Sequence, residues 1–99
     1  MNLPRKGSKI LCLDDVHYRW RAYSTQKGTE VRIAFHEIEG GQILVAQVPK
    51  LFNLRWLEPI IDYAHDNGWN PGEPGEPFYI RKNRETFRLV EDHEKPEKK

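Results

Sequence analysis

The residues whose types and spacing best suit ligand binding are arginines and a tyrosine on two neighbouring predicted strands. Arg19, Arg21 and Tyr23 alternate along one segment, and Arg32 lies in the next. Guanidinium groups bind phosphates, and an aromatic ring can stack on a nucleic-acid base. The group predicts a polyanion-binding patch, which a nucleic-acid-binding accessory protein would use. The alternative is a solvated strand face whose arginines pair with acids of this chain or of a partner.

Other features of the sequence weigh against nucleic acid. Tyr18 and Trp20 alternate onto the opposite face, so that only Tyr23 lies beside the arginines. The formal net charge of +1 gives no bulk attraction to a polyanion. The signature of the common sheet-based RNA-binding module is absent. We therefore expect a protein partner before a nucleic acid.

Residues able to bind a metal or perform catalysis form no recognisable motif. Asp62 and His65 have the i, i+3 spacing with which a helix offers two metal ligands, but no further metal motif completes a site. The segment Gly-Glu-Pro-Gly-Glu-Pro is unsuited to cradle a phosphate, because its prolines lack amide donors. No serine is placed as an activated nucleophile. The sequence predicts no catalytic, cofactor-binding or metal-binding residue, and a protein that is not an enzyme.

The composition is typical of one small domain. The chain has 99 residues, a hydrophobic content of 37% and one cysteine, Cys12. No apolar run reaches the roughly 18 residues of a transmembrane helix, and the N-terminal segment lacks the apolar stretch of a signal peptide. We expect a cytoplasmic bacterial protein with no membrane partner, and Cys12 buried as a small apolar side chain. A flexible arm (1–8), a folded core (9–90) and a charged tail (91–99) are expected.

Alternating apolar and polar residues predict the strands. Candidate strands cover residues 9–14, 16–25, 30–38 and 42–48, with short edge strands at 78–81 and 86–90. A two-residue turn at Lys27-Gly28 would place Trp20 opposite Phe35. A second turn at Gly40-Gly41 would place Phe35 opposite Ala46. The fold class is then α+β, a curled antiparallel meander of about three to five strands with one helix packed across one face.

These registers give the predicted sheet two different faces. The apolar face is expected to form the core, and it carries Tyr18, Trp20, Ala22, Val31, Ile33, Phe35, Leu44, Ala46 and Val48. The other face is basic at one end and apolar at the other, and its apolar end needs a cover. That end carries Ala34, His36, Ile38, Ile43 and Val45. The N-terminal segment around residues 10–13, a second copy of the chain or a ligand could supply the cover. We expect a small binding or adaptor module that self-associates through these residues, as a homodimer, or binds a small protein partner there.

A helix is expected after the strands, with Asn53 as its N-terminal cap. Its apolar stripe consists of Leu54, Leu57, Ile61 and Ala64. Pro59 removes a backbone hydrogen bond, so either the helix bends there or its regular part starts near Glu58. We favour a helix from about Leu54 that is irregular before Pro59. Gly68 is expected to end it.

The segment HDNGWNPGEPGEPF, residues 65–78, is interpreted as an ordered connector. Its prolines restrict the unfolded chain, so that ordering the segment costs less entropy. Trp69 would close the end of the core, and Phe78 would return the chain to the sheet. The predicted structural residues are Trp20, Phe35, Leu57, Ile61, Trp69 and Phe78.

The same segment carries a resemblance. Residues 60–78, IIDYAHDNGWNPGEPGEPF, resemble the end of many small uncharacterised bacterial proteins, in which an amphipathic helix precedes Asn-Gly-Trp, a proline, Pro-Gly and Pro-Phe. Such proteins look like products of integron gene cassettes or other mobile elements. The resemblance implies no activity. Their helix usually opens with Thr-Pro, whereas Asn53-Leu54 stands at that place here, so the start of the helix is open.

Overall fold

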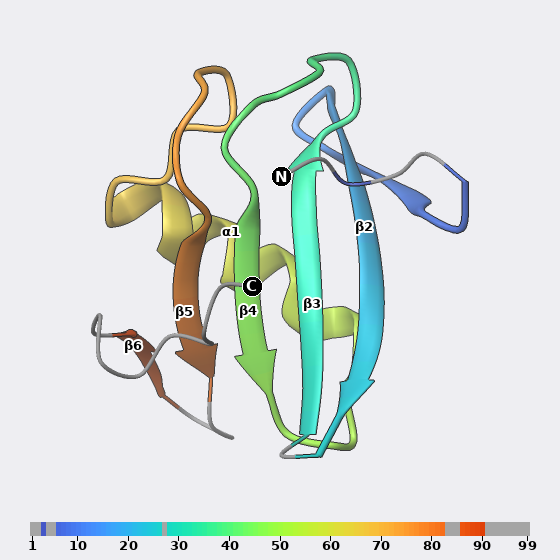
Figure 1. Cartoon of the computed structure of the whole chain (residues 1–99), viewed down its shortest axis with the longest axis vertical. Coiled ribbons are helices and arrows are strands. Elements are labelled where there is room, and N and C mark those ends of the chain that lie inside the picture. The colour runs from blue at the N-terminus through green and yellow to red at the C-terminus, as the bar shows by residue number, and fades with distance from the viewer. Residues whose placement is uncertain (1–2, 4–5, 27, 83–85, 91–99) are drawn as a thin grey trace.

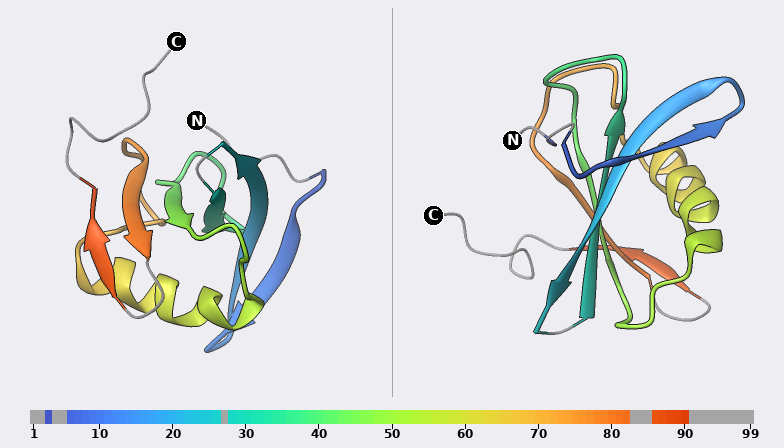
Figure 2. Two further views of the ribbon diagram at one scale, coloured as in Figure 1. Left: turned by 90° about the horizontal axis from the view of Figure 1, so that it is seen from below. Right: turned by 90° about the vertical axis from the view of Figure 1, so that its right-hand side faces the viewer.

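One mixed β-sheet with a helix across one face forms the fold (Figures 1 and 2). The computed structural model describes residues 3, 6–26, 28–82 and 86–90, so the predicted charged tail lies outside this part of the chain. The sheet has the strand order β1-β2-β3-β4-β5-β6. The strands are β1 (Lys9–Leu13), β2 (Val16–Thr25), β3 (Gly28–Phe35), β4 (Leu44–Val48), β5 (Phe78–Lys82) and β6 (Phe87–Leu89).

The α+β class is confirmed, but the predicted antiparallel meander of at most five strands is wrong. The sheet has six strands, and β4 runs parallel to β5 while every other neighbouring pair is antiparallel. The helix lies between β4 and β5 in the chain. A helical connection brings the next strand back in the same direction, which a short hairpin does not.

Both predicted registers are displaced, yet the two faces of the sheet are as expected. Trp20 pairs with Ile33 and not with Phe35, and Ile33 pairs with Leu44. Gly28 belongs to β3, where a Cβ atom would lie 2.6 Å from the carbonyl oxygen of Val48. Glycine is therefore required there for a close backbone approach, and not for a turn. Because the displacements are even numbers of residues, each side chain keeps its face.

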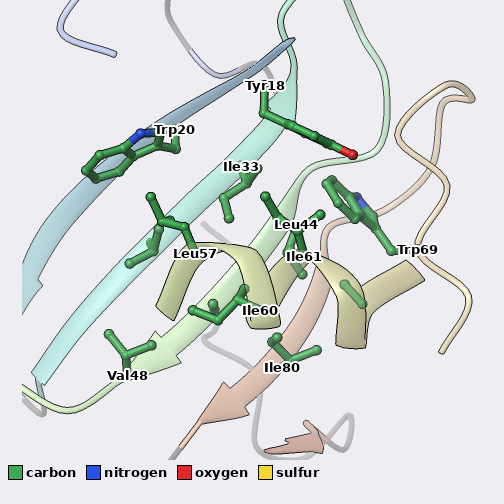
Figure 3. Close-up of a cluster of buried hydrophobic side chains, with 13 residues drawn as sticks. Tyr18, Trp20, Ile33, Leu44, Val48, Leu57, Ile60, Ile61, Trp69 and Ile80 are labelled. Atoms are coloured by element: carbon green, nitrogen blue, oxygen red, sulfur yellow. The ribbon is translucent and has the colours of Figure 1, made fainter. Parts of the chain in front are cut away.

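The core lies between the sheet and the helix, as Figure 3 shows. Trp20, Leu57, Ile61 and Trp69 are buried there, and the partly buried Phe35 and Phe78 pack against them. All six predicted structural residues thus lie in or against the core. Ala22 is exposed although it shares the core face, because β2 extends past the cover at this point. The other members of the predicted core face are buried: Tyr18, Val31, Ile33, Leu44, Ala46 and Val48.

A short 3-10 helix, η1 (Leu54–Trp56), precedes α1 (Leu57–Asp66). The side chain of Asn53 accepts a hydrogen bond from the amide of Arg55 at 2.9 Å, as a cap does. Pro59 lies in the first turn of α1, where an amide has no intrahelical acceptor to lose. The apolar stripe therefore begins at Leu57, while Leu54 is 61% exposed. Among the described residues, neither helix is long and apolar enough to span a bilayer.

The apolar end of the second face is covered from within the chain. Leu3 is buried in one cluster with Ala34, Ile43 and Val45, and Tyr79 packs against it. The N-terminal segment thus contributes a cover, but through Leu3 and not through residues 10–13. Those residues belong to β1, which extends the sheet beside β2. Alternation along β1 also exposes Cys12, so the prediction that this side chain is buried is wrong.

Gln42 joins the loop before β4 to the loop before β5 through hydrogen bonds. Its amide donates to the carbonyl of Glu73 at 2.8 Å, and its carbonyl accepts from Nε1 of Trp69 at 3.0 Å. Its side-chain Oε1 accepts from the amide of Asn70, and its Nε2 donates to the carbonyl of Glu76, each at 2.9 Å. The proline-rich connector is therefore held by hydrogen bonds along its length.

Candidate polyanion-binding surface

The sheet face opposite α1 carries a band of polar and basic side chains, which we call the basic face. Strand alternation directs these residues away from the helix, and the registers align them across five strands. One row runs Tyr23, Glu30, Gln47, Arg81 and Arg88, each paired with the next. A second row runs Arg21, Arg32, Val45 and Tyr79. The basic face therefore extends from β2 to β6, and Figure 1 shows the arrangement of these strands.

Tyr23 lies between two guanidinium groups at the β2 end of this face. Cζ of Arg21 is 5.0 Å from the centroid of its ring, and Cζ of Arg32 is 4.8 Å from it. Arg21 and Arg32 are also direct cross-strand partners, an arrangement that like charges disfavour. The negative face of the ring offsets that repulsion. Glu30 offsets it further, with one carboxylate oxygen 2.7 Å from both Nε and Nη2 of Arg32. Two cations are thus held close together.

Arg81 brings a third guanidinium to the basic face. Its Nε and Nη2 donate to Oε1 of Gln47 at 3.0 and 2.7 Å. Both side chains are half-buried, so this bidentate contact fixes the arginine against the sheet. Beyond it, the exposed Arg88 continues the row on β6. Neither Arg81 nor Arg88 was predicted as part of the patch, because the sequence gives no sign that β5 runs beside β4.

Arg19 does not belong to this surface, although the sequence grouped it with Arg21. Its side chain is only 2% exposed, and its Nη1 donates to the carbonyl of His36 at 3.0 Å. His36 is partly buried, and its Nδ1 is enclosed without a hydrogen-bond partner among the described residues. Ile38 is 39% exposed. The predicted interface thus consists of buried Ala34, Ile43 and Val45 with His36 and Ile38 at its margin.

The near-neutral net charge conceals a separation of charges. Glu30 is the only acid of the described residues that lies on the basic face. The others lie in turns and loops or on the helix: Asp14, Asp15, Glu37, Glu39, Glu58, Asp62, Asp66, Glu73 and Glu76. Net charge therefore underestimates the local positive potential of the basic face.

A second group of polar side chains surrounds Tyr18 on the helix side of the sheet. Its hydroxyl lies 3.1 Å from Nε2 of His65, whose ring is 4.9 Å from that of Trp69. Burial raises the pKa of Tyr18, and the negative charges of Asp62 and Asp14 raise this pKa further. A neutral Tyr18 hydroxyl can donate to His65. No group of three or more potential metal ligands gathers in the part of the chain that the structure describes.

The raised pKa of Tyr18 predicts a loss of stability in alkaline solution. Because the folded-state pKa exceeds the ordinary value of 10.0, folding favours the neutral phenol. Its contribution is present below that value and is lost as pH rises through the folded-state pKa. We expect the stability of the wild type to fall more than that of Tyr18→Phe between about pH 8 and pH 11, as measured by urea denaturation. Equal losses in the two proteins would contradict this assignment.

Comparison of the chain with family models, with curated proteins and with solved structures finds no match. The resemblance of residues 60–78 to integron-cassette proteins therefore stays a prediction.

Proposed function

We propose that this protein is a non-enzymatic binding module that holds single-stranded nucleic acid on the basic face. The observation that carries the proposal is the continuous row from Tyr23 on β2 to Arg88 on β6, flanked by Arg21 and Arg32. Sheets that bind single strands combine cations for the phosphates with aromatic rings for the bases. This face offers both.

The spacing of the row suits an extended strand. Neighbouring strands lie about 4.8 Å apart, so the four intervals from β2 to β6 span roughly 19 Å. Arg21 and Arg88 at the two ends would contact phosphates, and Arg81 would contact one between them. The edge of the Tyr23 ring would contact bases, and so would the exposed part of Tyr79, which also packs against the Leu3 cluster. Contacts between arginines and phosphates carry no sequence information, so the binding is expected to tolerate different sequences.

Self-association, the function that the sequence favours, is the second candidate. It was expected through Ala34, Ile43 and Val45, and these side chains are buried beneath Leu3 and Tyr79. A dimer built on them would require Leu3 to leave the sheet, at a cost in buried apolar area. The exposed side chain of Ile38 is the part of this patch that a second copy could contact directly. Size-exclusion chromatography with light scattering decides whether the chain is a monomer.

Removal of two arginines from the ends of the basic face tests the first candidate. Arg21→Ala/Arg88→Ala is expected to weaken the binding of a single-stranded oligonucleotide roughly tenfold and to reduce the salt slope by about 1 to 2. Fluorescence anisotropy at several salt concentrations gives both quantities. Neither side chain belongs to a hydrophobic core cluster, so the variant is expected to remain folded.

The matched control is Lys50→Ala/Arg55→Ala, which removes the same charge from exposed positions on the connection to α1. This variant is expected to bind as the wild type does. Equal losses in the two double variants would show that only net charge matters, and the site would be wrong. An absence of binding by the wild type at low salt would reject nucleic acid as the ligand.

A cytoplasmic location is part of the proposal. The exposed thiol of Cys12 is compatible with a reducing compartment, where free cysteines persist. Cell fractionation of the expressed protein checks this location.

A further inference from the structure

The outer edge of β2 is covered over only part of its length. β1 pairs with β2 from Val16 to Trp20, and among the described residues the ladder on this side ends at the pair Lys9–Trp20. From Arg21 to Thr25, β3 is the one strand of the described residues that pairs with β2. Figure 1 shows β1 beside only the upper part of β2. The lower part of β2 is therefore a sheet edge of the kind that can pair with another strand.

The ladder geometry identifies which backbone groups point outward. The amide of His36 donates to the carbonyl of His17, so the odd-numbered residues of β2 direct their hydrogen-bonding groups to β3, and the even-numbered ones, such as Trp20, direct theirs to β1 and the open edge. Ala22 and Ser24 have the same parity as Trp20, so their N–H and C=O groups point to the open edge. Both residues are exposed. An added strand can pair with these groups.

A pocket of about 230 Å³ lies beside this edge and is lined by Gly7, Lys9, Trp20, Arg21, Ala22 and Phe52. Its apolar wall is formed by Trp20 and Phe52, whose ring centroids are 6.0 Å apart. Lys9 lies over the Trp20 ring at 5.6 Å. The lining contains two cations and no acid. A ligand with apolar and negatively charged groups complements it.

We propose that the edge of β2 at Ala22 and Ser24 binds an extended peptide with alternating acidic and apolar residues by strand addition. In an added strand, successive side chains point to opposite faces of the sheet. Apolar side chains on the helix side enter the pocket beside Trp20 and Phe52. Acidic side chains on the other side meet Arg21. Main-chain pairing with side-chain pockets is a known mode of peptide recognition.

Charge favours such a peptide over a second copy of this chain. Two copies paired antiparallel through this edge about Tyr23 would place Arg21 of each opposite Thr25 of the other. β2 contains no acidic residue, so the β2 edge of a second copy would bring no negative charge to Arg21 or Lys9. An acidic peptide gains attraction at the same positions. This peptide site lies along an edge of the sheet and shares Arg21 with the basic face, but its main-chain pairing does not depend on the proposed nucleic-acid function.

Titration of the ¹⁵N-labelled protein with a capped peptide of alternating Glu and Leu tests the proposal. The amide signals of Ala22 and Ser24 are expected to shift, and a peptide with Lys in place of Glu is expected to bind at least tenfold more weakly. Ala22→Pro removes an outward N–H that β3 does not use, and edge positions tolerate proline. This variant is expected to lose affinity roughly tenfold. An undiminished affinity would overturn the proposal.

N-methylated peptides repeat the test on the unaltered protein, in case Ala22→Pro does not fold. Only every second residue of an added strand directs its amide toward β2. Methylation of one set of amides, either those of Leu or those of Glu, should therefore abolish binding. Methylation of the remaining set should be tolerated. Equal effects of the two sets would reject strand addition. Concentration-dependent shifts at Ala22 and Ser24 without peptide would also overturn the proposal, because a second copy would then occupy the edge.

Discussion

Trp20→Ala is expected to lower the free energy of unfolding by about 3–5 kcal/mol. Trp20 is 7% exposed, and it packs in the core of the sheet and against Phe52. Truncation leaves a cavity that the paired strands β2 and β3 cannot close, because their hydrogen bonds fix their spacing. A small domain has little more stability than this to lose, so the variant is expected to be largely unfolded at physiological temperature. Urea denaturation followed by circular dichroism measures the loss.

Leu54→Ala is the matched control for the Trp20 variant. Leu54 belongs to the apolar stripe that the sequence predicts, but its side chain is 61% exposed. Its removal is expected to change stability by less than about 0.5 kcal/mol. If Leu54→Ala cost as much as Trp20→Ala, the helix would pack on the sheet differently from the structure described.

Gly41→Ala is expected to cost at least about 2 kcal/mol through a steric clash at the junction of two loops. A Cβ atom on Gly41 would overlap the carbonyl oxygen of Pro71, which is backbone and cannot rotate away. Relief of the clash must separate the loops that the adjacent Gln42 joins through four hydrogen bonds. Thermal unfolding measures the loss. The indole hydrogen bond of Trp69 also allows its fluorescence to report the separation.

Gly72→Ala provides the comparison for this substitution. Gly72 follows Pro71 in the proline-rich loop, but a Cβ atom on Gly72 would meet its nearest neighbours at 3.7 Å, an ordinary contact. This variant is expected to be as stable as the wild type, or slightly more stable because alanine restricts the unfolded chain. A Gly41→Ala protein as stable as Gly72→Ala would show that the two loops are not locked together.

The faces of the sheet could be predicted from the sequence, whereas the registers could not. Alternation assigns a face to every residue, and errors of two or four residues leave this assignment intact. The registers were wrong because Gly28 and Gly41 were interpreted as turn residues. Gly28 and Gly41 are needed for close backbone approaches to Val48 and Pro71, and in a sequence this requirement is indistinguishable from a turn signal.

Only part of the candidate site could be predicted, because alternation of residues along a strand is a local signal. Arg21, Tyr23 and Arg32 lie on two strands joined by a short turn, so local alternation was sufficient to group them. Gln47 and Arg81 meet through the parallel pairing of β4 and β5, which depends on how the helix packs. Periodicity over a few residues contains no information on such long-range pairing.

The most direct test of the proposed function is to locate a bound oligonucleotide on the protein. A ¹⁵N-labelled sample titrated with a short single-stranded oligonucleotide at low salt is expected to show shifts at Arg21, Tyr23 and Arg81, together with their neighbours in the two rows. The exposed residues of α1 are expected to be unaffected, since that side of the molecule is acidic. Shifts confined to α1 or its loops, or no shifts at any position, would contradict binding on the basic face.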